Sequence, residues 1–308
     1  MDGLLVIDKT AGITSHDVVD RVRHILRTKR VGHTGTLDPF ATGVMVVVVG
    51  RATRLAQFLD KDEKEYEATV RFGFETDTGD VTGVRSAECG MRNEEIAAKL
   101  ASADWEMILK QFRGEIEQMP PMYSAKKIGG KKLYESARKG VNVERKLQRV
   151  NISELRVSGS RPVGIADRSD PDSNELRLHV TCSAGTYIRT LAEDIGRAVG
   201  VGAHLTGLRR TRSGRFTLEK SLTLEQLAGA DDPAAALLPI ERAVEHLPEF
   251  ELWTERIAAT RNGMSTRVSD PFFTNGDTVR MVSPSGELVA IGNYSSEEGA
   301  VKPKVVLV

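Results

Sequence analysis

The chain has 308 residues, of which 40% are hydrophobic, and its 43 basic side chains balance 43 acidic ones. Such a length predicts about two domains, and the apolar content is sufficient for a sizeable core. The chain has no apolar stretch of membrane-spanning length and does not begin with a secretory signal, so we expect a soluble, cytoplasmic protein with no membrane partner. Its two cysteines, Cys89 and Cys182, are far apart and lack metal-ligand spacing, which argues against a zinc site and against a disulfide.

The charges are unevenly distributed along the chain. Nine Lys or Arg residues stand against two Glu between Tyr123 and Val150, whereas nine acidic residues stand against three basic ones between Glu219 and Arg256. A net charge of zero would by itself argue against a nucleic-acid partner. The segregation instead predicts one strongly positive face and one negative face.

The N-terminal residues predict a buried strand at residues 4–7, followed by an amphipathic helix. Ser15 is the expected N-cap, and the apolar face of the helix consists of Val18, Val19, Val22, Ile25 and Leu26. Three arginines on the other face are either solvated or in contact with phosphate: Arg21, Arg23 and Arg27.

A glycine-rich loop at residues 32–43 precedes an uninterrupted apolar run at residues 44–49. Because the run lacks alternation, it predicts a strand buried on both faces. Pro39 fixes its own φ and favours an extended Asp38, so the loop presents a carboxylate on stiff backbone beside the core. An isolated buried charge is costly, and Asp38 therefore needs solvent, a hydrogen bond or a cation. Two interpretations remain open, an Asx turn without chemistry or a reactive carboxylate.

After a helix predicted at residues 51–59, alternation predicts a strand at residues 66–74. Tyr66 lies on the core-facing side of that strand, and a core tyrosine with a satisfied hydroxyl is one interpretation of it. Two further helices, the second closed by a glycine, are predicted at residues 93–100 and 105–112.

Residues 120–150 begin with two prolines and continue as a basic segment with interleaved aromatic residues, among them Tyr123 and Tyr134. Cations neutralise phosphates and aromatic rings stack on unpaired bases, so this composition suits RNA. The alternative is a solvated surface helix. The salt dependence of RNA binding separates the two interpretations.

The next stretch predicts a strand leading into a helix. Short strands at residues 150–152 and 155–157 and a polar loop come first, and then alternation predicts a half-buried strand at residues 176–182. The turn at residues 183–186 leads into a helix that ends at Gly200, with a buried stripe of Ile188, Leu191, Ala192, Ile195 and Val199. Arg189 lies in the first turn, where a cation opposes the helix macrodipole. It therefore needs an anionic partner, and we expect that partner to be Asp38.

The C-terminal quarter has a different texture. Residues 223–226 form a capping box that opens a short helix, and the acidic, proline-punctuated residues 231–248 predict a linker. Beyond it we expect a helix at residues 254–262 and a small β-rich barrel built from residues 278–282, 288–291 and 304–308.

Four blocks of this sequence resemble the TruB family of pseudouridine synthases. They are Leu5–Lys9 with Gly12, the loop Gly32–Gly43, Tyr123–Lys126 with Gly130–Tyr134, and Cys182–Thr190. The resemblance implies an α+β pseudouridine synthase fold, with a central mixed, largely antiparallel sheet flanked by helices. It also implies a catalytic domain at residues 1–245, with a basic RNA-contacting insertion at about 120–150, and a PUA-like RNA-binding barrel at residues 250–308.

The resemblance implies an enzyme that isomerises uridine 55 in the TΨC loop of tRNA, without a metal, a cofactor or an obligate protein partner. Asp38 would be the catalytic nucleophile or base, Tyr66 would pack against the target base, and Arg189 would pair with Asp38. His33 would fill the space left by the extruded nucleotides, and Leu208 would complete the pocket wall. Further substrate-binding positions are Lys9, Lys64 and Tyr187, of which the two lysines are structural or RNA-facing. The implied RNA contacts are Lys126, Lys127, Lys131, Lys132, Arg138 and Lys139.

The family usually has proline where this chain has Thr10, which leaves the detailed role of Lys9 open. A guanidinium beside Asp38 is expected to lower the pKa of that carboxyl and keep it ionised. The target nucleotide has to be flipped out of a folded loop, at a cost of a few kcal/mol. Two other functions compete with this one. The first is a non-catalytic RNA-binding or tRNA-folding chaperone. The second is phosphoryl transfer at Asp8-Lys9-Thr10, a short motif that resembles the aspartyl-phosphate loop of cation-pumping ATPases, although this chain has no predicted transmembrane helices to support a pump.

Overall fold

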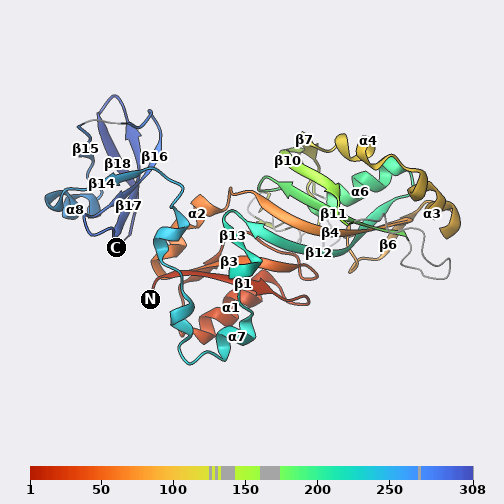
Figure 1. Cartoon of the computed structure of the whole chain (residues 1–308), viewed down its shortest axis with the longest axis horizontal. Helices are drawn as coiled ribbons and strands as arrows, with labels where there is room; N and C mark the ends of the chain where they lie inside the picture. Colours follow the sequence, from red (N-terminus) through yellow and green to blue (C-terminus); the bar gives the residue numbers. More distant parts are fainter. Residues whose placement is uncertain (125–126, 129–130, 133–142, 160–173, 270–271, 308) are drawn as a thin grey trace.

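The computed structural model in Figure 1 describes residues 1–124, 127–128, 131–132, 143–159, 174–269 and 272–307. At residues 127–128 and 131–132 it describes the backbone only, as the short paired strands β8 (Lys127–Ile128) and β9 (Lys131–Lys132). The predicted RNA contacts Lys126, Arg138 and Lys139 lie outside the described residues. Within the described ranges, no helix is both long enough and apolar enough to cross a bilayer.

The larger sheet of the described chain has nine strands and carries the site. Its strand order is β1-β3-β12-β4-β11-β10-β7, with β2 beside β3 and β13 beside β12. All neighbours are antiparallel except β3 and β12. The predicted mixed, largely antiparallel sheet is thus confirmed. The strands are β1 (Gly3–Lys9), β2 (Val31–His33), β3 (Thr42–Val49), β4 (Lys64–Phe72), β7 (Gly114–Gln118), β10 (Gln148–Val157), β11 (Glu175–Cys182), β12 (Ala203–Ser213) and β13 (Phe216–Thr217).

Helices cover the sheet in two groups. The helix α6 (Ile188–Val199) packs on β4, β11 and β12 through the apolar stripe that its sequence predicts, and α3 (Asn93–Ser102) and α4 (Trp105–Lys110) extend that core. The helices α1 (Ser15–Ile25) and α7 (Leu224–Ala228) cover β1 and β3. Residues 43–49 of β3 are all buried because this strand lies between two such cores, which explains its unbroken apolar sequence. Short elements complete this part: η1 (Gly50–Leu55), α2 (Ala56–Leu59), β5 (Phe74–Thr76) and β6 (Arg85–Glu88).

Four local predictions are corrected by the structure. Thr14, not Ser15, caps α1 in a reciprocal capping box with Asp17, because the Ser15 hydroxyl is buried and bonded elsewhere. The two short strands predicted at residues 150–157 are one strand, β10, with an irregularity in its pairing with β11. Gly114 begins β7, a strand that sequence alone did not predict. The segment predicted as a linker is packed rather than extended, with Ile240, Ala243 and Val244 buried against β1 and α2.

The C-terminal residues form a second sheet, which curls on itself in the upper left of Figure 1. Its order is β14-β16-β17-β18-β15, with α8 (Thr254–Arg261) against it. One core cluster joins it to the larger sheet, since Val282, Ile291 and Leu307 pack with Leu4 and Val46. The strands are β14 (Glu249–Glu251), β15 (Thr266–Arg267), β16 (Thr278–Val282), β17 (Leu288–Ser295) and β18 (Ala300–Val306).

Candidate active site

The loop that carries Asp38 connects β2 to β3 and is fastened on both sides of the aspartate. On one side, Ser15 Oγ donates to the carbonyl of Leu37 at 3.0 Å and accepts from its N–H at 2.8 Å. On the other side, Lys9 Nζ donates to the carbonyls of Pro39 and Ala41 at 3.2 and 2.7 Å. Because residues of α1 and β1 hold the peptide groups on both sides of Asp38, the backbone from which its carboxylate projects is fixed in position.

Arg189 projects from the first turn of α6 onto that carboxylate. Its Nε lies 3.0 Å from Asp38 Oδ2, and its Nη2 donates to Asp38 Oδ1 at 3.2 Å. This two-point ion pair is the contact that the helix position of Arg189 predicted. Such forked geometry fixes both orientation and charge.

The remaining N–H groups of Arg189 are bonded to three other groups. Nη1 donates to the carbonyl of Thr78 at 2.8 Å and lies 3.5 Å from Asp80 Oδ2, while Nη2 also donates to the carbonyl of Tyr123 at 2.7 Å. A guanidinium has five N–H donors. Here the two Nη atoms make four hydrogen bonds, and Nε faces Asp38 Oδ2 as an ion-pair contact. The Arg189 side chain is only 5% exposed, so its position is determined by the protein around it.

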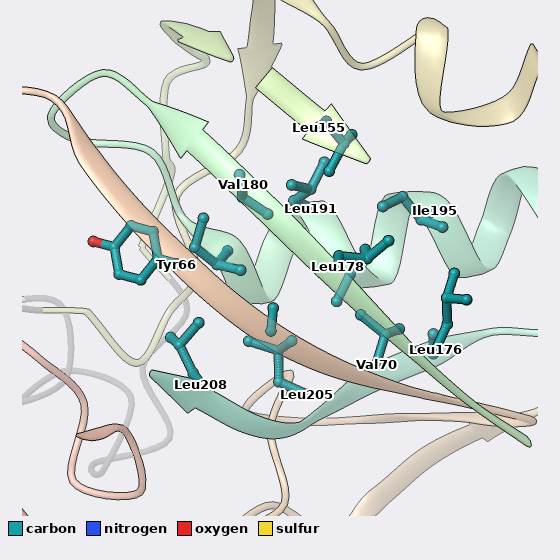
Figure 2. Packing of buried hydrophobic residues seen from close by; sticks show 14 of the residues in the cluster. Tyr66, Val70, Leu155, Leu176, Leu178, Val180, Leu191, Ile195, Leu205 and Leu208 are labelled. Carbon is teal, nitrogen blue, oxygen red and sulfur yellow. The ribbon is translucent and has the colours of Figure 1, made fainter. Parts of the chain in front are cut away.

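A pocket of about 280 Å³ lies against Asp38 and is lined by Tyr66, Tyr187, Arg189 and Leu208, among others. Figure 2 shows Tyr66 and Leu208 at one end of the apolar cluster, with the Tyr66 hydroxyl pointing away from the aliphatic side chains. Pocket and core are therefore continuous. A planar ring entering this pocket meets an aromatic face, an aliphatic wall and the Asp38 carboxylate, and Asp60 also lines the pocket.

Arg210 is a second buried cation of this pocket, and the sequence did not single it out. It is 2% exposed, and it donates from Nε to the carbonyl of Val44 at 2.6 Å and from Nη2 to that of Gly35 at 3.1 Å. Burial raises the pKa of Tyr66, while the positive charge of Arg210 opposes that shift. Arg210 thus ties β12 to β3 at Val44 and to the Asp38 loop at Gly35, in the wall of the same pocket as Tyr66.

The pKa of Asp38 departs from the sequence-based expectation. Burial raises it above its ordinary value of 3.8, and Asp80 adds to the rise, while Arg189 and Lys9 lower it. The expectation that the guanidinium would bring the pKa below that value is therefore wrong, because desolvation outweighs the attraction. The carboxylate still keeps 32% of its side-chain surface exposed, and it lines the pocket.

The other predicted positions are distributed around the pocket. Lys64 lines it and donates to the carbonyls of Asp60 and Asp62 at 2.9 and 2.5 Å. Tyr187 lines it as the N-cap residue of α6. His33 is half-buried at the end of β2 and does not line the pocket; burial lowers its pKa. Lys9 is fully buried and bonds the loop carbonyls described above, which favours the structural role over the RNA-facing one.

The motif Asp8-Lys9-Thr10 does not form a site of its own. The Asp8 carboxylate is held by Arg209, with contacts of 2.7 and 3.1 Å, and it does not line the pocket. This placement leaves the phosphoryl-transfer interpretation without a nucleophile at the cavity. Among the described residues, no three His, Cys, Asp or Glu side chains gather as metal ligands.

Comparisons with known proteins agree with this architecture. Residues 23–188 match the model of the TruB family pseudouridylate synthase N-terminal domain, and residues 189–245 match that of the tRNA pseudouridylate synthase B C-terminal domain. The chain is 40% identical to tRNA pseudouridine synthase B of Bacillus pumilus and 38% identical to that of Bacillus subtilis, in both cases over 100% of this chain and 98% of the relative. A solved Cbf5-Nop10-Gar1 complex contains a chain that is 30% identical, with a TM-score of 0.70 over 99% of this chain and 85% of that one. The chain therefore belongs to the TruB family of pseudouridine synthases, which are isomerases.

Proposed function

We propose that this protein converts uridine 55 in the TΨC loop of tRNA to pseudouridine, with Asp38 as the nucleophile or base. The observation that carries the proposal is the Asp38 carboxylate, held by Arg189 at 3.0 Å on the wall of a pocket that also presents Tyr66 and Leu208. The relatives named tRNA pseudouridine synthase B support the substrate class.

The reaction is a rearrangement that balances within one nucleotide. The glycosidic bond from uracil N1 to ribose C1′ breaks, the uracil turns, a bond from C5 to C1′ forms, and the proton lost from C5 is matched by one gained at N1. Asp38 acts on the ribose or the base as a carboxylate, and Arg189 keeps it charged and oriented. Tyr66 packs against the base during the turn, and Leu208 with Lys64 and Tyr187 encloses it.

The pocket holds one extruded nucleotide, so the RNA loop has to be deformed at a cost of a few kcal/mol. We propose that His33 fills the space vacated in the loop. The basic segment at residues 120–150 and the PUA-like unit at residues 250–308 would hold the RNA against the catalytic domain of residues 1–245. The reaction would take place in the cytoplasm, where tRNA is matured, and with no obligate protein partner.

The test is Asp38→Asn with a tRNA stem–loop as substrate. An amide cannot act as nucleophile or base, so pseudouridine should be absent from nucleoside digests while RNA affinity remains. Asp231→Asn is the matched control, since Asp231 is exposed in the segment beyond α7 and should leave turnover unchanged.

Turnover that persists in Asp38→Asn would refute the catalytic assignment. It would leave a non-catalytic RNA-binding or tRNA-folding role on the same fold. Absence of pseudouridine with the unaltered protein would refute the enzyme proposal itself.

A further inference from the structure

Residues 118–123, which run from the last residue of β7 into the start of the basic insertion, are attached to the first turn of α6 at three points. Gln118 bonds the peptide groups of Tyr187, Thr190 Oγ1 donates to the carbonyl of Met119 at 3.3 Å, and Arg189 Nη2 donates to the carbonyl of Tyr123 at 2.7 Å. These contacts join segments about seventy residues apart in the sequence and converge on the turn that carries Arg189.

Gln118 makes the most specific of these contacts. It is 1% exposed, its Oε1 accepts from the Tyr187 N–H at 3.0 Å, and its Nε2 donates to the Tyr187 carbonyl at 3.3 Å. One amide therefore satisfies both polar groups of one residue, as a neighbouring strand would. Its own backbone is fixed in the sheet, because Gln118 is the last residue of β7 and pairs with Gln148 of β10.

The residue held in this way begins the helix. Tyr187 is the N-cap residue of α6, and its side chain makes no capping hydrogen bond. A helix start without a side-chain cap is free to fray or rotate unless something else fixes it. Here the Gln118 amide fixes it two residues before Arg189.

We propose that Gln118 is a positioning residue, which acts through the Tyr187 peptide to hold the first turn of α6 so that Arg189 meets Asp38 in its two-point contact. The inference rests on the proposed function and extends it to a residue that does not line the pocket. Gln118 itself does not touch the substrate. It determines the geometry of the pair that does the chemistry.

The test uses Gln118→Met, which retains length and loses both hydrogen bonds, with turnover measured on the tRNA stem–loop. We expect kcat to fall about 10²-fold, the loss typical of a misplaced reacting group, with KM nearly unchanged. Gln111→Met is the matched control, because Gln111 is the exposed C-cap residue of α4 and, within the described part of the chain, its side-chain amide bonds only the Met107 carbonyl, at 3.4 Å. It should retain wild-type kcat.

A pH profile separates positioning from a merely structural role. The charged groups that act on Asp38 are Arg189 of α6, Asp80 of the turn after β5 and Lys9 of β1. A loosened Arg189 lowers the pKa of Asp38 less, so the acid limb of kcat should move to higher pH in Gln118→Met. A variant that is only less stable would lose active protein without moving that limb.

Unchanged kcat, or a loss of kcat that matches the folded fraction by circular dichroism with an unmoved acid limb, would overturn the proposal. If Gln118→Met does not fold, Gln118→Asn, which is uncharged and one methylene too short to reach the Tyr187 peptide groups, is measured with the same expectation. Failure of the proposed function is distinguished at once, since the unaltered protein would then make no pseudouridine.

Discussion

Arg189 lies between two carboxylates, Asp38 at 3.0 Å and Asp80 at 3.5 Å, and its cost of burial is offset by both. Asp80 is itself fixed, since its Oδ1 accepts from Thr78 Oγ1 and from the Thr82 N–H, each at 2.9 Å. The Asp38 carboxylate is thus the end of a row of three charged side chains, Asp38, Arg189 and Asp80. The direction in which its titration responds to substitution follows from this arrangement.

Replacing Arg189 by Gln removes the largest influence that lowers the pKa of Asp38. That pKa, already raised by burial, should rise further. Since Asp38 reacts as a carboxylate, activity falls as pH drops through this pKa, and the acid limb should therefore move to higher pH. At neutral pH we expect a loss of kcat of about 10²–10³-fold, measured by nucleoside analysis across a pH series. An acid limb that stays in place would contradict the coupling.

Lys9 is a second buried group with a shifted pKa, and its pKa is lowered where that of Asp38 is raised. Burial lowers its pKa from 10.5 to about 8, although the charge on Asp38 raises it. Between these two values the unfolded state binds more protons than the folded state, so stability rises with pH. The unfolding free energy of the wild type relative to Lys9→Met should therefore increase by about 2 kcal/mol between pH 8 and pH 10.5. A pH-independent difference in urea titrations would argue against this burial.

At the scale of elements, α1 serves as a support for the Asp38 loop through Ser15. Ser15→Ala leaves the buried N–H and carbonyl of Leu37 without partners, and each such loss costs about 1–3 kcal/mol. Denaturant unfolding should show a lower midpoint and an unchanged m-value. Ser102→Ala, at the exposed end of α3, is the control and should have little effect. Equal stability of the two variants would refute a supporting role for Ser15.

The basic insertion is expected to grip phosphates. Neutralising Lys126, Lys127, Lys131 and Lys132 should reduce the slope of log K against log salt by about 0.7–0.9 for each phosphate that these lysines neutralise in the wild type. Fluorescence anisotropy of a labelled stem–loop over a salt series measures this. An unchanged slope would return the segment to the interpretation of a solvated surface.

The sequence predicts those parts of the site whose structure depends on neighbouring residues, and it misses those that depend on how distant strands pair. The glycines and Pro39 are enough to predict the Asp38 loop, and the position of Arg189 at the start of a helix is enough to predict that it needs an anionic partner. Arg210 does not, because its burial depends on β12 lying between β3 and β4 and on their register. The sequence likewise leaves Lys9 as either structural or RNA-facing, and only the bonds of its Nζ to the Pro39 and Ala41 carbonyls show that it lies beneath the loop.

For the whole molecule, the two sheets share a core cluster, so we expect them to unfold together. Arg51 and Arg54 of η1 also donate to the carbonyls of Leu307 and Val306 at the C-terminal end. The chain's two tryptophans report the two parts separately, Trp105 beside Phe72 and Trp253 before α8. Fluorescence of Trp105→Phe and Trp253→Phe should give coincident urea transitions. Two separated midpoints would show independent units.

The contacts of Arg189 inside the protein affect which residues determine tRNA affinity and which determine the catalytic rate. Both Nη atoms of Arg189 donate inside the protein, its Nε faces the Asp38 carboxylate, and its side chain is only 5% exposed. An incoming phosphate therefore has little access to this guanidinium, and the strength of tRNA binding should owe little to it. Tight docking of a tRNA and its conversion would then be governed by separate groups of atoms. Release of the product would then leave the ion pairs of Asp38, Arg189 and Asp80 intact for the next uridine.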